Sequence, residues 1–176
     1  MLLASTGIRA DKIRLAATQE YDRTPPQFNG QTHDFYRITR WGDPNVGFVG
    51  SVRDYGYGIY HAPLARLLDR LAPGRANDLS GSGFAAVLQE LRLGRPVLVW
   101  VTTTMRPPSR WVTWRTPRGR FTGTIQEHAV LVVGYTPRAL IINNPLSGRR
   151  ESVAPQPFIE AWKQLGRQVL VVAPHK

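Results

Sequence analysis

Two apolar segments near the end of the chain constrain its fold more than any other feature. The first covers residues 128–134 and the second residues 139–143, and both are rich in Val, Leu and Ile. Runs of this length that are apolar on both faces are typical of buried strands. The short segment between them, Tyr135-Thr136-Pro137-Arg138, has turn-forming residues. We therefore expect an antiparallel hairpin in the centre of a sheet.

This hairpin brings a histidine close to an asparagine. With the turn centred near residue 136 or 137, His128 lies opposite about Pro145, within a residue or so of Asn144. Cross-strand spacings then place the two residues roughly 5–7 Å apart. A carboxamide oxygen beside an imidazole can fix the tautomer and orientation of the ring, as in a Cys-His-Asn site. The alternative is structural, because a His can be a polar strand end and an Asn before Pro is a common turn former.

The rest of the chain predicts helices followed by an antiparallel sheet, which is an α+β fold. The pattern predicts helices over residues 11–19 (capped by Asp11, with Ile13 and Leu15 inward), from Pro63 to Leu71, from a Ser80 or Ser82 cap to Gly94, and over residues 155–165. Further strands are expected from Pro96 to Thr103 and over residues 168–173, with a more polar hairpin over residues 111–125. Residues 20–60, rich in Gly, Pro, Asn and aromatic residues, are expected to form a long covering loop.

Length and composition indicate one globular domain over residues 1–176. The chain has 176 residues and 42% hydrophobic residues, enough for a sizeable core. No apolar run is long enough to cross a bilayer, and the first residues lack the basic and apolar regions of a signal peptide. As written, the chain is expected to be soluble and cytoplasmic.

The chain contains no cysteine, which excludes disulfides, thiolate metal sites and thiol catalysis within these residues. Its histidines are scattered, without the spacing of a zinc site, so we expect no metal and no cofactor. The four are His33, His61, His128 and His175.

The formal net charge of +11 comes mostly from arginine and could attract nucleic acid, anionic lipid or acidic cell-wall polymers. The basic residues are spread along the chain, with local excess only at 106–120 and 149–150, and no nucleic-acid-reading motif accompanies them. We therefore expect no specific nucleic-acid binding.

Six segments resemble the C39-like peptidase family, and they follow one another over nearly the whole chain. They are Asp43-Pro-Asn-Val-Gly-Phe-Val-Gly, Gly56-Tyr-Gly-Ile-Tyr-His-Ala-Pro-Leu-Ala, Gly94-Arg-Pro-Val-Leu-Val-Trp-Val, Glu127-His-Ala-Val-Leu-Val-Val-Gly-Tyr, Ile142-Asn-Asn-Pro-Leu-Ser-Gly and Phe158-Ile-Glu-Ala-Trp-Lys-Gln-Leu-Gly-Arg-Gln.

The resemblance implies a papain-like fold with a Cys-His-Asp/Asn site. In that site His128 matches the general base and Asn144 the orienting residue, where Asp before Pro is the commoner choice. An Asn would orient the imidazole but would stabilise imidazolium less than a carboxylate does.

The departure from the family pattern lies at the front of the chain. The family's nucleophile stands at the start of a helix, with a Gln a few residues earlier that contributes to the oxyanion hole. Residues 1–8 resemble the C-terminal end of that helix, so the Cys and the Gln would both precede Met1. Ser5 lies too near the helix end to replace the thiol.

The leading hypothesis is therefore a C39-like cysteine peptidase or amidase, inactive as written because its first helix is truncated or its gene start is placed too late. The complete protein would act on a peptide or amide substrate, and would be secreted or in the cell envelope if an export signal is also missing. The alternative is a non-catalytic module that binds peptide or polyanion through its basic surface. The substrate and the oligomeric state stay open.

Two further interpretations concern residues outside the pair. Glu127 should point to the opposite face from His128 and pair with an arginine. Among the tryptophans, Trp100 and Trp162 are expected in the core, whereas Trp111 and Trp114 are candidates to flank a groove.

Overall fold

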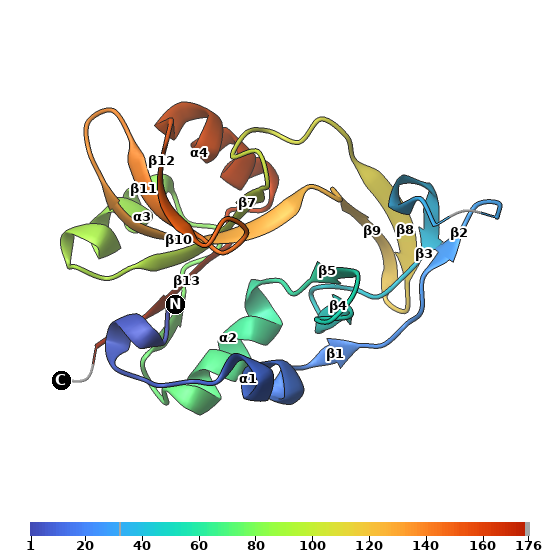
Figure 1. Cartoon of the computed structure of the whole chain (residues 1–176), viewed down its shortest axis with the longest axis horizontal. Coiled ribbons are helices and arrows are strands. Elements are labelled where there is room, and N and C mark those ends of the chain that lie inside the picture. The colour runs from blue at the N-terminus through green and yellow to red at the C-terminus, as the bar shows by residue number, and fades with distance from the viewer. Residues whose placement is uncertain (32, 175–176) are drawn as a thin grey trace.

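The computed structural model describes residues 1–31 and 33–174, and its centre is a six-stranded antiparallel sheet (Figure 1). Across the sheet the strands are β12 (Arg149–Val153), β11 (Leu140–Asn144), β10 (Glu127–Tyr135), β7 (Val97–Thr102), β13 (Val169–Val172) and β6 (Ala76–Asp78). The expected central strands are confirmed, since β10 pairs with both β7 and β11. Two edge strands, β6 and β12, were not expected from the sequence.

The hairpin of β10 and β11 has the expected turn and a small irregularity. Leu131 pairs with Asn143 and Val132 with Ile142, and the register then shifts by one residue before Gly134. Continuing the Leu131–Asn143 register towards the strand ends places His128 opposite Leu146, one residue further than the sequence predicts. The difference comes from the turn, which is centred between Pro137 and Arg138 because Tyr135 pairs with Leu140. That register alone would place His128 opposite Ser147, and the bulge brings its partner back by one residue.

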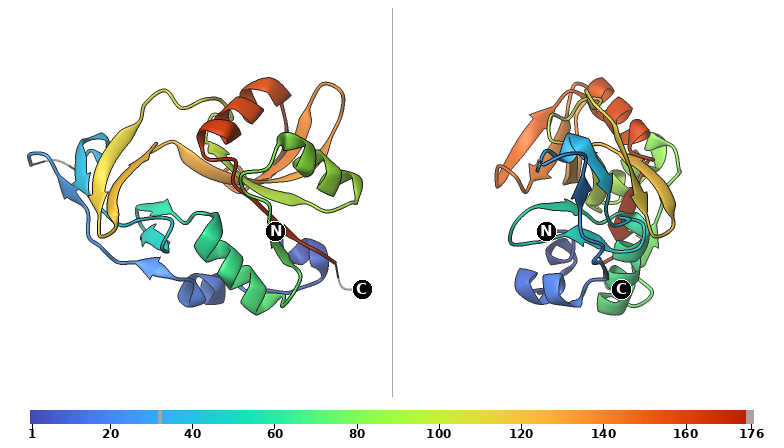
Figure 2. Two further views of the ribbon diagram at one scale, coloured as in Figure 1. Left: turned by 180° about the vertical axis from the view of Figure 1, so that it is seen from behind. Right: turned by 90° about the vertical axis from the view of Figure 1, so that its right-hand side faces the viewer.

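Helices cover both faces of the sheet (Figure 2). On one face α3 (Phe84–Arg92) and α4 (Pro155–Gln164) bury Val87, Phe158 and Trp162 against the valines of β7, β10 and β13. On the other face Leu68 of α2 (His61–Leu71) packs against the strand side chains that point to that face. Each strand therefore contributes alternate side chains to two cores, which explains why these strands are apolar at nearly every position. The expected core positions of Trp100 and Trp162 are confirmed.

Residues 20–60 form short strands, and the prediction of one long irregular loop is wrong. The elements are β1 (Tyr21–Asp22), β2 (Gln27–Phe28), a 3-10 helix η2 (Phe35–Arg37), β3 (Ile38–Arg40), β4 (Phe48–Gly50) and β5 (Gly56–Gly58). Within this segment Trp41 and Val49 are almost completely buried. Strands of two or three residues are too short to show the alternation that marks a strand in a sequence.

The predicted polar hairpin is confirmed as β8 (Val112–Thr116) and β9 (Gly119–Gly123), and it belongs to a second sheet of order β2-β3-β8-β9. Trp114 is only 1% exposed and its Nε1 donates to the carbonyl of Gly42 over 2.9 Å. The prediction that Trp114 flanks a groove is therefore wrong, because alternation turns it inward while Trp111 stays exposed.

The helix starts agree only partly with the expected caps. Asp11 caps α1 (Lys12–Thr18) by accepting from the backbone N–H of Arg14, as expected. Ile13 is 61% exposed, so its inward placement is wrong. Neither Ser80 nor Ser82 caps α3, which begins after Gly83 without a side-chain cap. The Ser80 hydroxyl instead accepts from the N–H of Val169 and ties the β6 end to β13.

We predict that Trp114→Phe destabilises the fold by about 2–4 kcal/mol, because it leaves the Gly42 carbonyl without its donor and opens a cavity among aromatic rings. Trp111→Phe is the matched control on the same strand segment and should change the unfolding free energy by less than about 0.5 kcal/mol. Urea unfolding measures both. Equal effects would contradict the assignment of Trp114 to the core.

Candidate active site

His128 and Asn144 lie at neighbouring strand ends and are joined by a hydrogen bond. His128 Nε2 lies 2.8 Å from Asn144 Oδ1, and Asn144 is only 7% exposed. A carboxamide oxygen can only accept, so the imidazole donates through Nε2–H. The other ring nitrogen, Nδ1, is then left as the acceptor that can take a proton. The structure thus brings together the two residues that the hairpin pattern singles out.

The carboxamide of Asn144 is held at both ends. Its oxygen also accepts from the N–H of Leu146 over 3.0 Å, a local turn that the following Pro145 favours. Its nitrogen donates to the two carboxylate oxygens of Glu151 over 3.3 and 3.1 Å. The Ser147 hydroxyl donates to the same carboxylate. Hydrogen bonds from Ser147 and Asn144 lower the pKa of the Glu151 carboxyl, and the nearby positive charge of Arg149 lowers it further.

Sequence reasoning missed Glu151 because it missed the strand that carries it. In the β11–β12 hairpin Ile142 pairs with Glu151, so the Glu151 side chain lies on the same sheet face as Ile142 and Asn144. The turn Asn144-Pro-Leu-Ser-Gly followed by a polar segment was the available signal. β12 is polar and mostly exposed, so it lacks the apolar pattern that identifies a strand.

Glu127 points away from the His128 side, towards β5. Gly58 has φ of +124°, and a Cβ there would lie 3.1 Å from Glu127 Oε2, so the carboxyl packs directly against the glycine backbone. Burial raises the pKa of Glu127 to about 8. Among the residues that the structure describes, no arginine forms an ion pair with Glu127, so the predicted arginine partner is wrong.

The first eight residues have the hydrogen bonds of a helix C-terminus. Around the short element η1 (Ala4–Thr6), the N–H of Ile8 bonds the carbonyl of Leu3 and the N–H of Gly7 bonds that of Ala4, with φ of 79° at Gly7. This pair of bonds is the Schellman motif that closes helix C-termini. Met1 shares a hollow of about 340 Å³ with Asn144.

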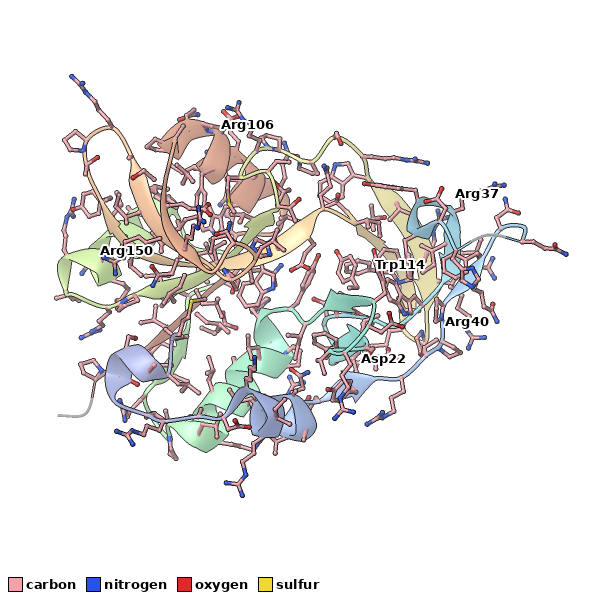
Figure 3. All side chains as sticks on the ribbon, viewed as in Figure 1. Asp22, Arg37, Arg40, Arg106, Trp114 and Arg150 are labelled. Atoms are coloured by element: carbon pink, nitrogen blue, oxygen red, sulfur yellow. The ribbon has the colours of Figure 1, made fainter. Side chains whose placement is uncertain are left out.

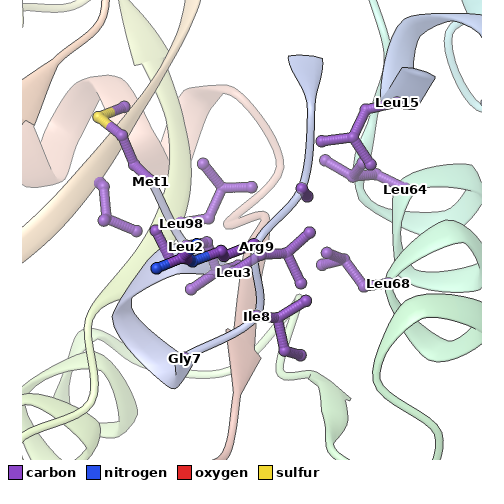
Figure 4. A pocket seen from close by; sticks show the side chains of 13 residues that line it. Met1, Leu2, Leu3, Gly7, Ile8, Arg9, Leu15, Leu64, Leu68 and Leu98 are labelled. Carbon is purple, nitrogen blue, oxygen red and sulfur yellow. The ribbon is translucent and has the colours of Figure 1, made fainter. Parts of the chain in front are cut away.

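An apolar groove lies beside this helix end. It has a volume of about 830 Å³ and is lined by the first residues, α2 and two strands of the central sheet. Figure 4 shows Leu3, Ile8, Leu15, Leu64 and Leu68 directed towards one another between the N-terminal segment and α2.

Of the described histidines outside the pair, His61 has a carboxylate rather than a carboxamide as its partner. His61 Nδ1 lies 2.6 Å from Asp78 Oδ2 at the start of α2, and His175 lies outside the described residues. Within the described part of the chain, no three His, Asp or Glu side chains are arranged to hold a metal ion. The described helices are also too short and polar to span a bilayer.

Comparison with known proteins gives a consistent set of relatives. The model of the family described as Peptidase_C39 like family matches residues 1–170. The chain is 38% identical over 132 residues to the uncharacterized protein YvpB of Bacillus subtilis, and the match covers 74% of this chain and 53% of that protein. The chain thus spans about half the length of this relative. A crystal structure described as a putative C39-like peptidase from Bacillus anthracis superposes with a TM-score of 0.84 at 30% identity, over 99% of this chain and 85% of that one.

We predict that Glu127, which is partly buried, makes the fold less stable as the pH rises. Its pKa is raised from 4.5 to about 8 in the folded chain, so between these values the folded state holds a proton that the unfolded state releases. Stability is therefore lost as the pH rises through this window, by at most about 1.4 kcal/mol per pH unit. Glu127→Gln stays neutral and should lack this loss.

Urea unfolding of both proteins at several values between pH 4.5 and pH 8 measures the difference. Glu160→Gln, at an exposed position of α4, is the control and should follow the wild-type curve. Parallel curves for wild type and Glu127→Gln would show that Glu127 keeps an ordinary pKa.

Proposed function

Because this chain belongs to the Peptidase_C39 like family, we propose that residues 1–176 form the greater part of one cysteine peptidase or amidase domain. In this proposal a segment before Met1 supplies the nucleophilic thiol. The observation that carries it is the 2.8 Å hydrogen bond between His128 Nε2 and Asn144 Oδ1. It leaves Nδ1 as the acceptor, which is the arrangement a general base needs.

The proposed reaction uses His128 first as base and then as acid. Nδ1 takes the thiol proton, and the thiolate attacks the amide carbonyl to form a tetrahedral intermediate. The protonated imidazole then gives its proton to the departing amine, leaving a thioester. Water, deprotonated by the same nitrogen, hydrolyses the thioester and restores the thiol. Asn144 holds the ring throughout, because its oxygen accepts from Nε2–H in both protonation states.

The N-terminal segment supports this placement of the thiol. Residues 1–8 have the geometry of a helix that ends at Gly7, and Met1 shares a hollow with Asn144. A helix running into Met1 would therefore pass beside the His128–Asn144 pair. The apolar groove of about 830 Å³ next to it offers a surface for the apolar side of such a helix (Figure 4). The chain itself has no cysteine, so without that segment the imidazole has no thiol to activate.

We predict that the protein purified from its native source is heavier than the 176-residue chain and contains a cysteine before Met1. The 176-residue chain should show no thiol-dependent hydrolysis of peptide or amide substrates. In the longer protein, His128→Ala should lower kcat/KM at least about a hundredfold, because it removes the general base. Intact mass and a peptidase assay measure these outcomes.

His61→Ala is the control, since the His61 ring, like that of His128, is hydrogen-bonded to a side-chain oxygen but lies outside the proposed site. It should leave kcat/KM within about twofold. A native mass equal to that of the 176-residue chain, or equal losses for the two histidine variants, would contradict the proposal.

A second candidate function, binding of a polyanion, is favoured by a row of arginines across the second sheet. Arg40 on β3 pairs with Arg115 on β8, and Arg115 pairs with Arg120 on β9. Directly paired residues share one sheet face, and all three side chains are exposed. None forms an ion pair with a described residue. Like charges placed opposite one another destabilise a sheet unless an anion neutralises them.

The chemistry of this arginine row suits phosphate groups. Guanidinium groups bind phosphate oxygens through paired hydrogen bonds, and the hydroxyls of Thr113 and Thr122 lie next to the row on the same face. Figure 3 shows Arg40 and Arg37 at this end of the molecule and Arg150 at the opposite end. For this candidate function we propose a polymer of phosphates as the partner, and the test below separates it from an acidic peptide.

We predict that changing Arg40, Arg115 and Arg120 together to Gln weakens binding of inorganic polyphosphate more than about tenfold at low salt. The control changes Arg14, Arg92 and Arg138, which are exposed outside the second sheet, to Gln and should lose less than about threefold. Equal losses would mean non-specific attraction by the net charge, and preferential binding of polyglutamate would favour an acidic peptide.

A further inference from the structure

An asparagine that orients an imidazole must itself be held in one of two orientations, whereas an aspartate need not be. The two ends of a carboxamide differ, since the oxygen only accepts and the nitrogen only donates. If the group were turned over, the Asn144 nitrogen would face the N–H of Leu146, where two donors would meet. It would also donate to His128 Nε2, which would move the ring proton to Nδ1 and leave the imidazole in the wrong tautomer for a base at that nitrogen. Something must therefore hold the amide in the productive orientation.

Glu151 provides the contact that distinguishes the two ends. Both of its carboxylate oxygens accept from Asn144 Nδ2, over 3.3 and 3.1 Å. In the reversed orientation the Asn144 oxygen would face this carboxylate, which places two acceptors together. The Ser147 hydroxyl donates to Glu151 and in turn accepts from the N–H of Arg149 over 3.3 Å, so the carboxylate is itself fixed by the β11–β12 turn.

We infer that Glu151 is a positioning residue, which holds the Asn144 carboxamide with its oxygen towards His128. This inference rests on the proposed function for its catalytic meaning, but its geometry belongs to the described chain. Glu151 acts through Asn144, which alone of the two bonds the imidazole. The continuous chain of hydrogen bonds runs from His128 through Asn144 to Glu151 and then to Ser147.

The same geometry explains why Glu151 suits an Asn, rather than an Asp, at position 144. An Asp at position 144 would present identical oxygens to both sides and would need no orienting partner. It would also place a second carboxylate within hydrogen-bonding distance of Glu151, and two like charges so close repel each other. Glu151 therefore supports an Asn at position 144 and opposes an Asp there.

The N–H of Leu146 is the other group that selects the amide orientation, since it donates to Asn144 Oδ1 over 3.0 Å. It is a backbone donor and is present in every variant of Glu151. Any change caused by substitution of Glu151 therefore measures how much the carboxylate contributes to holding the Asn144 amide in place.

The experiment uses the 176-residue chain labelled with nitrogen-15 and needs no catalytic activity. NMR measures how fast the Nε2 proton of His128 exchanges with water, with the resonance assigned by its loss in His128→Ala. Glu151→Ala should speed this exchange about tenfold or more, because the amide loses a hydrogen bond to a charged group. Glu151→Gln should stay within about twofold of wild type, because its carbonyl can still accept from Asn144 Nδ2.

Two controls separate positioning from a general effect on the hairpin. Glu160→Ala removes an exposed carboxylate on α4 and should leave the exchange rate unchanged. Asn144→Asp is then combined with Glu151→Ala. In this background the loss of Glu151 should no longer speed the exchange, because a carboxylate at position 144 has no wrong orientation.

The outcomes are distinct from those of the proposed function. Equal acceleration by Glu151→Ala with and without Asn144→Asp would mean that Glu151 only stabilises the turn. No acceleration in the chain that keeps Asn144 would mean that Leu146 alone orients the amide. Either result overturns the inference. Failure of the native-length protein to hydrolyse any amide would overturn the proposed function and leave the exchange pattern intact.

Discussion

The pairing of β10 with two neighbours at once is the constraint on which the rest of the structure depends. Residues 127–130 pair with β7, Leu131 and Val132 pair with both β7 and β11, and Gly134 and Tyr135 pair with β11. The start of β10 therefore extends past the end of the β11 ladder. His128 lies on this extension, where its ring reaches the side chain of Asn144 at the end of β11. If β10 began only where its pairing with β11 begins, no strand would hold the imidazole of His128 in place.

The same strand explains why the central sheet was predictable and the second sheet was not. β7, β10, β11 and β13 send side chains into cores on both faces, so they are apolar at nearly every position and are easily recognised. The segment 20–60 instead buries single residues such as Trp41 from strands of two or three residues. Its order comes from tertiary contacts, among them the stacking of Phe35 on Tyr55, between residues far apart in the sequence. Local pattern contains little of that information.

The candidate site was likewise predictable only in part. The placement of His128 near Asn144 follows from a hairpin whose turn can be located to within about a residue. The turn lies slightly later in the chain than expected, and the bulge before Gly134 partly offsets this difference. The hydrogen bonds beyond that pair were not predictable, because Glu151 lies on a polar strand. Glu127 likewise faces a glycine from a distant part of the chain. Which groups surround a strand end is set by the partner strands, and those are known only from the fold.

The base half of the proposed site is built entirely by the β10–β11–β12 sheet. The hydrogen bonds that fix His128, Asn144 and Glu151 all come from this sheet and its turns. The imidazole, the carboxamide and the carboxylate can therefore keep their mutual orientation whether or not a helix precedes Met1. In the proposed function the thiol comes from a different structural unit, a segment that would lead into the N-terminal residues near the hollow shared by Met1 and Asn144. The sheet thus fixes the direction in which the imidazole presents Nδ1, and the position of the helix decides whether a thiol meets it.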